Sequence, residues 1–372
     1  MSKLNSTSIL RVACVAVIGV LIFACPKPPE AVAQDVRSAE PQAGAQVETE
    51  DMEAAQTHDR MLTADQLSEK VKKILFPEPP PSDEPGPEAF GTGGHPFTTK
   101  RASAQGGTPA GTPVELFPYR PTGKLFMQFG AQTFVCSASV IRKGLLVTAA
   151  HCVHNFGDEN NGWAGAVTFQ PARHDGSVPF GTWTGSQWWI PTVYWNGSDN
   201  CTVPGIVCEN DVAVVVVQQL GGQSIGDVTG MYGFPVNDDD FGYVPNFLGQ
   251  TAGQITQLGY PARDYSGVRM IRTDSLGYWD DPNNVIIGSA QTGGSSGGPW
   301  LMNFGIDTSY TGPPASDDTA NQVVATTSWG FISGAVKVQG ASRFSSNAAF
   351  PAPNSNIQAL VNAACAANPG AC

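Results

Sequence analysis

Three short segments decide the fold of this chain: Leu146–Cys152 (LVTAAHC), Asn210–Val214 (NDVAV) and Gly293–Pro299 (GGSSGGP). In chain order they supply a histidine, an aspartate and a serine, which together perform acyl transfer in many hydrolases. A serine hydroxyl is a weak nucleophile at neutral pH, so it needs a base to remove its proton and an acid to orient that base. Glycines beside the serine let backbone N–H groups approach a developing oxyanion. The pattern predicts a nucleophilic hydrolase.

The three segments resemble those of the trypsin-like (chymotrypsin-fold) serine endopeptidases, over roughly residues 121–366. Two further segments support the resemblance: Cys136–Val140 (CSASV) is similar to the strand that is cross-linked to the histidine loop, and Thr327–Gly330 (TSWG) is similar to the strand that lines the substrate cleft. The stretch 155–208 matches poorly. The resemblance implies an all-β fold of two six-stranded antiparallel barrels, with the site between them.

The resemblance also implies a role for each site residue. His151 would be the general base, Asp211 would orient it, and Ser296 would be the nucleophile. The backbone N–H groups of Gly294 and Ser296 would form the oxyanion hole. Ser295 is an alternative nucleophile, but Ser296 is the serine that directly precedes Gly-Gly-Pro.

The chain departs from the family pattern at positions that bear on activation and specificity. Most members have an aspartate before the nucleophile, where this chain has Ser295, and it resembles a bacterial branch that includes glutamyl endopeptidases. That branch places a histidine where this chain has Thr327. The base of the specificity pocket corresponds to Ala290, which carries no charge. The substrate-binding residues implied are Ala290, Gly293, Thr327, Ser328, Trp329 and Gly330.

The pocket expected from these residues favours medium or large uncharged side chains before the scissile bond. Gly330 and Gly340 would leave room for such a side chain. Burying a charged side chain without a partner would cost several kcal/mol. A preference for glutamate stays open, because Gln291 and Thr327 offer hydrogen bonds.

Composition and patterning agree with a β-rich exported protein. The chain has 372 residues, 14% charged, with a net charge of −12 and no basic cluster, which excludes the electrostatic signature of nucleic-acid binding. A helix is predicted over Asn354–Ala366, from the apolar face that includes Ile357 and Leu360. Short β-rich runs between turn residues predict the strands. They are Lys124–Phe129, Thr133–Val140, Leu145–Thr148, Val212–Val217, Gln254–Leu258, Met270–Tyr278, Val285–Gly288, Val323–Trp329 and Gly340–Phe344.

Six cysteines lie beyond the N-terminal region. Six cysteines allow 15 pairings, and proximity along the chain favours Cys136–Cys152, Cys201–Cys208 and Cys365–Cys372. A metal site is disfavoured, because the sequence has no C-x-x-C pair and only three histidines after residue 121. We expect His154 and His174 to lie at the surface. The acidic run Asp238–Asp240 is interpreted as a solvated turn, with calcium binding as the alternative.

The N-terminus resembles an export signal, assigned here to residues 1–33. Val12–Ala24 is an apolar run of 13 residues, shorter than the roughly 20 that span a bilayer, and Ala31–Ala33 is an A-x-A cleavage site. Ile22–Cys25 is an alternative lipobox that would anchor the chain through Cys25. We expect secretion and no integral membrane segment in the mature form.

Residues 34–120 are interpreted as an acidic, proline-rich pro-region or linker that precedes a protease domain at 121–372. Ten of the 29 prolines fall in residues 77–120. Such a composition predicts a largely disordered segment. One exception is Met61–Phe76, where apolar spacing predicts a helix, either loosely held or docked on the domain before processing.

The sequence therefore predicts a secreted serine endopeptidase that uses neither metal nor cofactor, acts on protein or peptide substrates and is a monomer. The alternative is a catalytically inactive homologue that serves as a binding or adhesion module. An α/β-hydrolase esterase is disfavoured, because that class orders its triad serine, acid, histidine.

Overall fold

The computed structural model describes residues 35–47, 56–57, 61–63, 95–102, 113–235, 244–247, 250–280, 284–305, 319–332 and 336–372. The predicted export signal at 1–33 and the acidic run Asp238–Asp240 lie outside these residues. So does nearly all of the predicted helix Met61–Phe76, although its first two residues are in a strand. The described residues from 35 onward form a single structural unit.

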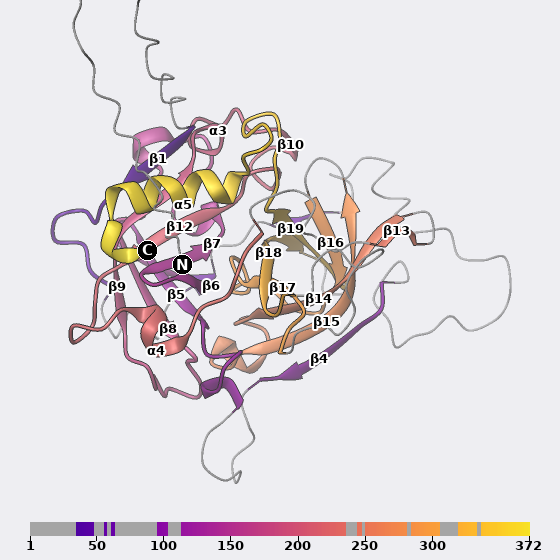
Figure 1. Cartoon of the computed structure of the whole chain (residues 1–372), viewed down its shortest axis with the longest axis horizontal. Helices are drawn as coiled ribbons and strands as arrows, with labels where there is room; N and C mark the ends of the chain where they lie inside the picture. The colour runs from indigo at the N-terminus through magenta and orange to yellow at the C-terminus, as the bar shows by residue number, and fades with distance from the viewer. Residues whose placement is uncertain are drawn as a thin grey trace, which may run out of the picture. The chain divides into compact units, whose positions relative to one another are not determined.

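The first barrel is a closed sheet of six antiparallel strands (Figure 1). Its order is β9-β12-β7-β6-β5-β8, and β8 pairs with β9 to close it. The strands are β5 (Thr122–Phe129), β6 (Gln132–Arg142), β7 (Leu145–Thr148), β8 (Ala166–Pro171), β9 (Trp183–Pro191) and β12 (Ala213–Val217).

The second barrel repeats this closure later in the chain. Its order is β14-β17-β18-β19-β16-β15, closed by pairing of β14 with β15. The strands are β14 (Gln250–Gly259), β15 (Ile271–Asp280), β16 (Asn284–Gly288), β17 (Pro299–Met302), β18 (Gln322–Phe331) and β19 (Val338–Arg343). The two barrels confirm the predicted fold class. All nine predicted strands are present, while β8, β9 and β17 had not been predicted.

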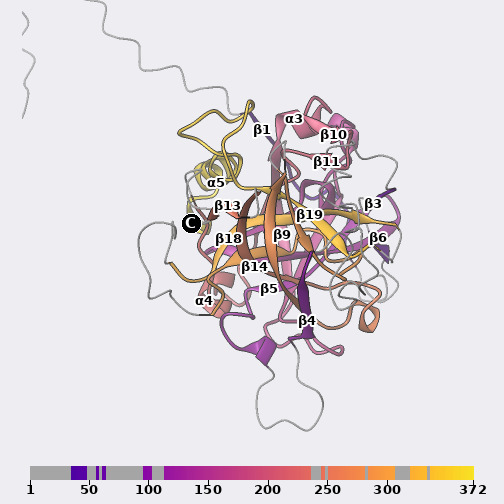
Figure 2. The same ribbon diagram turned by 90° about the vertical axis from the view of Figure 1, so that its right-hand side faces the viewer.

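Additional strands extend both sheets. From the N-terminal region, β1 (Val36–Ala39) pairs with β9, and β4 (Phe97–Arg101) pairs with β15 along the outside of the second barrel (Figure 2). Two strands of two residues each, β2 (Gln56–Thr57) and β3 (Met61–Leu62), lie parallel to β6 and β18. Later in the chain, β13 (Val244–Phe247) pairs with β14. Strands β1–β4 thus give order to parts of the stretch interpreted as a disordered pro-region.

The helices are few and short apart from the C-terminal one. They are α3 (Thr192–Trp195), α4 (Ile225–Thr229) and α5 (Asn356–Ala367), with 3-10 turns at Pro113–Glu115, Ala150–Cys152, Glu159–Asn161, Tyr265–Gly267 and Pro369–Ala371. Helix α5 is capped by Ser355, which precedes it and whose hydroxyl accepts the Gln358 N–H at 3.3 Å. Its buried Ile357 and Leu360 join the core formed with Val214 of the first barrel.

The three disulfides have the pairing that proximity favoured. Cys136–Cys152, Cys201–Cys208 and Cys365–Cys372 are all formed. The second of them closes the hairpin of β10 (Cys201–Val203) and β11 (Val207–Cys208). Val203 and Val207 of this hairpin pack against Trp329 and Phe331 of β18, so the poorly matched stretch 155–208 supplies cover for a strand of the second barrel.

Candidate active site

His151 is held by backbone geometry and by a cross-link. It lies in the 3-10 turn Ala150–Cys152, which follows directly on β7, and it is fully buried. The neighbouring Cys152 is bonded to Cys136 of β6, so the turn is tied to the adjacent strand of the same barrel. These constraints leave the imidazole little freedom to move.

Asp211 lies just before β12 and accepts several hydrogen bonds in a buried position. Its Oδ2 is 2.7 Å from His151 Nδ1 and accepts the Ser328 hydroxyl at 2.6 Å, and its Oδ1 accepts the His151 backbone N–H at 2.8 Å. Burial alone would raise the pKa of Asp211, but the charge and hydrogen bonds of His151 and the bond from Ser328 together lower it. The lowered pKa favours the carboxylate form, which is hydrogen-bonded to the imidazole.

Ser296 lies in the loop Gly293–Pro299, immediately before β17, and is 6% exposed. Gly294 and Gly297 in this loop have φ of 90° and 75°, a region that side chains with a Cβ rarely adopt. The first barrel holds this loop through Ser137 of β6. The Ser137 N–H donates to the Ser296 carbonyl at 2.7 Å, and its hydroxyl donates to the Gly294 carbonyl at 2.8 Å.

The serine loop touches the end of the strand that carries the histidine turn. A Cβ placed on Gly297 would lie 2.0 Å from Thr148 Oγ1 and 2.9 Å from the Ala149 nitrogen. Thr148 and Ala149 come three and two residues before His151. The structure therefore brings the three predicted catalytic segments to one place between the barrels, and only glycine fits at 297.

The hydroxyl of the alternative nucleophile, Ser295, makes two hydrogen bonds within the protein. It donates to the Thr292 carbonyl at 2.7 Å and accepts from Gln339 Nε2 at 3.1 Å. His154 is buried, contrary to the prediction for it: its ring packs edge-on against Trp163, and its Nε2 lies 2.6 Å from the Glu159 carbonyl oxygen. His174, by contrast, is partly exposed and lies 2.7 Å from Glu115.

A cavity of about 200 Å³ lies beside the serine loop. Ala290, Gly293 and Gly330 line it, as the resemblance implied. Thr327, Ser328 and Trp329 do not, and the Ser328 hydroxyl instead donates to Asp211. The Thr327 hydroxyl accepts hydrogen bonds from Gln257 and Trp300, at 3.0 and 2.9 Å, inside the second barrel.

Gly340 makes room for a different side chain from the one predicted. A Cβ at Gly340 would lie 2.0 Å from the indole of Trp329, so the missing Cβ accommodates this tryptophan and not a substrate. The Trp329 ring N–H donates to Asn284 Oδ1 at 2.8 Å, which fixes the indole. The prediction that Gly340 leaves space for a substrate was therefore wrong.

Two basic residues of the cavity escaped the sequence analysis. Arg263 and Lys337 line it, together with the neutral Gln339 and Gln291. Arg263 lies between β14 and β15, and Lys337 directly precedes β19. Burial raises the pKa of the neighbouring Asp264, and the positive charges of Lys337 and Arg263 oppose this shift. Neither cation lies in a recognisable motif, so the sequence offered no local signal for them.

A buried carboxylate next to the aspartate segment was also missed. Asp199 accepts hydrogen bonds from the Asn210 side-chain and backbone N–H groups, at 2.7 and 2.8 Å. Asn210 Oδ1 in turn accepts from Asn347 at 2.8 Å and from Asn356 at 3.3 Å. This network fixes the residue before Asp211 and connects it to the start of α5.

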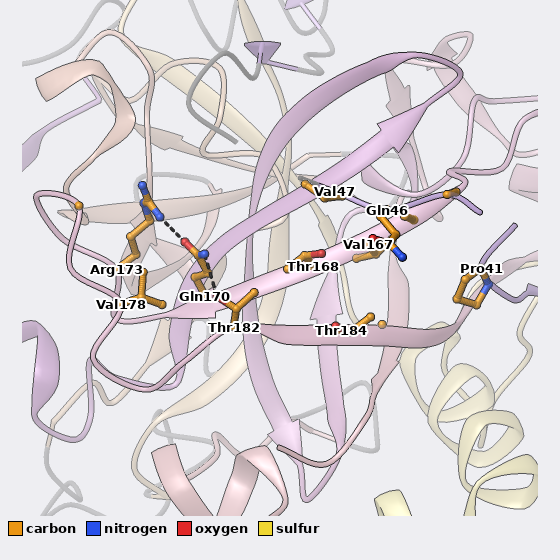
Figure 3. Close-up of a pocket in the computed structure, with 14 residues that line it drawn as sticks. Pro41, Gln46, Val47, Val167, Thr168, Gln170, Arg173, Val178, Thr182 and Thr184 are labelled. Atoms are coloured by element: carbon orange, nitrogen blue, oxygen red, sulfur yellow. Dashed lines mark hydrogen bonds between the residues drawn. The ribbon is translucent and has the colours of Figure 1, made fainter. Parts of the chain in front are cut away.

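A second cavity lies away from these residues. It has a volume of about 700 Å³ and lies along β8 and β9, beside residues 41–47 (Figure 3). Arg173 and Gln170 lie at one end of it, hydrogen-bonded to each other. It contains none of His151, Asp211 or Ser296.

Two groups of potential metal ligands occur among the described residues. One consists of Cys136, His151 and Cys152, and the other of Asp199, Cys201 and Cys208. In each group the two cysteines form a disulfide with each other, which removes the thiolates that would bind a metal. Each group therefore retains a single available ligand and does not fit a metal site.

No protein-family model matches the chain. It is 21% identical over 202 residues to the glutamyl endopeptidase of Bacillus licheniformis, a match that covers 54% of this chain and 55% of that protein. The resemblance to the trypsin-like serine endopeptidases is confirmed. The chain also matches an extracellular metalloprotease of Bacillus subtilis, at 33% identity over 75 residues, 20% of this chain and 23% of that protein. The chain thus spans about half or less of the curated relatives it matches.

Solved structures of proteases are similar to this chain. The protease Anisep from Arthrobacter nicotinovorans has a TM-score of 0.49 at 24% identity, covering 66% of this chain and 96% of that one. A Glu endopeptidase in complex with MPD has a TM-score of 0.47 at 17% identity, covering 73% and 96%.

Proposed function

We propose that this protein is a secreted serine endopeptidase that acts through an acyl-enzyme intermediate. The observation that carries the proposal is the buried group formed by His151, Asp211 and Ser328, which lies beside the loop that presents Ser296. Export is supported by the apolar run with its cleavage site and by the three disulfides, which form in oxidising compartments. No helix among the described residues is long and apolar enough to cross a bilayer.

In the proposed reaction, the Ser296 hydroxyl attacks the carbonyl carbon of the scissile peptide bond. His151 accepts the hydroxyl proton, and Asp211 stabilises the imidazolium that forms. The backbone N–H groups of Gly294 and Ser296 stabilise the negative charge that develops on the carbonyl oxygen. His151 then protonates the leaving amine as the peptide C–N bond breaks. Water next attacks the ester on Ser296 while His151 accepts its proton, and His151 returns that proton to the Ser296 oxygen as the ester bond breaks.

The test is labelling by a fluorophosphonate together with peptide hydrolysis by the Ser296→Ala variant. We expect the wild-type protein to be labelled on Ser296, and the variant to lose about 10⁴-fold or more in kcat because the nucleophile is absent. Ser295→Ala is the matched control, one residue away, and it should change kcat far less. Retained turnover in Ser296→Ala, or labelling of Ser295, would contradict the assignment.

The alternative is an inactive homologue that binds a partner. The same labelling decides between the two, because a homologue without a working site would not react with the fluorophosphonate. The hydrogen bonds of Asp211 favour the enzyme, since a buried carboxylate and imidazole are costly to keep unless they are used or well compensated.

For specificity, the cavity favours an acidic side chain more than the sequence analysis had allowed. Arg263 and Lys337 put two positive charges on its lining, while Ala290 is neutral. An acidic side chain before the scissile bond would gain from both charges, and a lysine or arginine would be repelled. The similarity to a protein named glutamyl endopeptidase points the same way. We therefore propose the order Glu, then uncharged side chains such as Leu or Phe, then Arg.

Matched peptides that differ only in this residue, with Glu, Gln, Leu or Arg, would test the order. In Lys337→Gln we expect the ratio of kcat/KM for Glu over Gln to fall roughly two- to five-fold, the size of a partly exposed ion pair. Arg269→Gln is the control, because Arg269 pairs with Asp175 outside this cavity. A higher kcat/KM for the Arg peptide than for the Glu peptide would refute the proposed specificity. An unchanged ratio of kcat/KM for Glu over Gln in Lys337→Gln would show that Lys337 does not contact the substrate side chain.

A further inference from the structure

Strand β18 has a backbone edge beside the candidate active site that β17 does not cover. Pairing of β17 with β18 ends at Thr326, and the serine loop then bonds to Thr327 through Gly297 and Gly298. On its other side, β18 stays paired with β19 as far as Gly330. From Ser328 to Phe331 the first edge is therefore open to an added strand.

Within the described part of the chain, the N-terminal strand β3 occupies this edge. Met61 pairs with Gly330 and Leu62 with Phe331, in the parallel direction. The two partners are 269 residues apart in the sequence, so the pairing does not arise from chain proximity. The edge that β3 uses borders the cavity assigned above to the substrate side chain.

Met61 also lines that cavity. It is half-buried, and its Sδ lies 4.0 Å from the position that a Cβ would take on Gly330. A methionine side chain is unbranched and flexible, so it fits irregular apolar space. The segment therefore uses both features that would bind an extended peptide: a free strand edge and the adjacent side-chain cavity.

We propose that the edge Ser328–Phe331 of β18, with the cavity beside Gly330, is a docking surface for residues 61–62 of this same chain, so that the uncleaved protein blocks its own substrate cleft. A peptide cannot pair with this edge while β3 does, because each backbone group serves one neighbouring strand. Removal of the segment by proteolysis frees both edge and cavity. The proposal rests on the proposed function for its consequence, although the docking itself does not.

The identity of residue 295 is consistent with control by occlusion of the cleft. Ser295 stands where most trypsin-like members have an aspartate, so it cannot form an ion pair with a newly cut N-terminus. Its hydroxyl instead bonds to Thr292 and Gln339. Occlusion by the N-terminal segment leaves the serine loop formed and controls access to it.

The kinetic test compares the full-length wild-type chain with the full-length double variant Met61→Gly/Leu62→Pro. Glycine removes the side chain from the cavity, and proline removes a strand N–H. With rates normalised by fluorophosphonate titration, we expect kcat/KM for a short chromogenic peptide to rise about ten-fold, mainly through KM, since the occluded fraction is released. A synthetic peptide of residues 57–66 should inhibit the variant competitively.

Leu116→Gly is the matched control, because it removes an exposed apolar side chain (58% exposed) that is not among the residues lining the cavity, and it should leave kcat/KM unchanged. Intact mass confirms that each preparation retains its N-terminal segment. Equal kcat/KM in wild type and double variant, with both fully titrated by the fluorophosphonate, would overturn the docking proposal.

Hydrogen exchange separates failure of the docking from failure of the proposed function. In the full-length Ser296→Ala protein, which cannot cut itself, the amides of residues 329–331 should exchange about ten-fold faster after Met61→Gly/Leu62→Pro is added. Unchanged exchange there would overturn the docking even if the protein proved to be a protease. Faster exchange in the Ser296→Ala protein, together with a wild-type protein that the fluorophosphonate does not label, would keep the docking and refute the proposed function.

Discussion

The two barrels are closed in the same way but contribute different things to the site. The first barrel supplies His151 and Asp211, and its interior is apolar, with Leu125, Val215 and Trp188 all fully buried. The second supplies Ser296 and the cavity, and its interior includes a hydrogen-bonded group of neutral polar side chains. These are Gln257, Ser289, Thr327 and Gln339.

The difference extends to covalent cross-links. One disulfide ties the histidine turn to β6, and a second closes the loop between β9 and β12. The third lies at the C-terminal end of the chain, in and after α5. None joins strands of the second barrel among the described residues. His151 is therefore held beside a covalent cross-link and by the Asp211 carboxylate, whereas the lining of the cavity includes the amides of Gln291 and Gln339.

The comparison predicts that the largest effect of a single substitution outside the nucleophile comes from Asp211. Asp211→Asn should lower kcat by about 10⁴-fold, because an amide cannot stabilise the imidazolium and favours the wrong tautomer of His151. Ser328→Ala removes only one of the hydrogen bonds that Asp211 accepts, so a loss of about ten-fold is expected. Steady-state kinetics with a single peptide would measure both.

Thermal unfolding should show that both variants remain folded, since the assignment concerns chemistry. Equal losses in the two variants would mean that the hydroxyl and the carboxylate act as one unit. A loss below ten-fold in Asp211→Asn would remove Asp211 from the proposed triad.

The next largest effect concerns pH and Asp199. Burial, with a contribution from the charge of Glu209, raises the pKa of Asp199 to about 7 even though hydrogen bonds from Asn210 oppose the shift. In the unfolded chain the pKa is about 3.9. The folded state therefore holds the proton more tightly, and its stability falls as pH rises from about 4 to about 7. Between pH 5 and pH 8 the loss should be about 2–3 kcal/mol.

Urea unfolding at the two pH values would measure this contribution. In Asp199→Asn the pH dependence should shrink by that amount, because the amide does not ionise. Asp227→Asn is the control, since the Asp227 side chain is 53% exposed and its ion pair with Lys143 lies at the surface. The same pH dependence in wild type and Asp199→Asn would show that Asp199 is ionised throughout.

The sequence could predict the elements whose signal is local. The histidine, aspartate and serine segments are each contiguous, and their resemblance to those of the trypsin-like serine endopeptidases implied the fold. Local β-rich runs predicted nine of the strands. Strands β3 and β4 could not be predicted, because they pair with strands that lie about 270 and about 170 residues later in the chain. Asp199, Arg263 and Lys337 lie in loops, where position depends on the packing of both barrels. The role of Gly340 was misjudged because the Trp329 indole fills the space beside it.

The smallest expected effect tests the polar interior of the second barrel. Gln339 accepts from Gln257 Nε2 at 2.6 Å and donates to Ser295 at 3.1 Å. Gln339→Leu removes these bonds, but Gln257 keeps its bond to Thr327, so we expect a loss of about 1–2 kcal/mol in the free energy of unfolding. An equivalent change at the exposed Gln223, Gln223→Leu, should cost less than about 0.5 kcal/mol.

The kinetic readout of Gln339→Leu sharpens the contrast between the barrels. Gln339 lines the cavity, so KM should rise and the ratio of Glu to Leu substrates should fall by about three- to ten-fold, while kcat stays within about three-fold of wild type. If kcat instead fell by more than 100-fold with stability unchanged, Gln339 would be acting through Ser295 on the serine loop. The second barrel would then share in fixing the catalytic groups, and the division of labour between the barrels would fail.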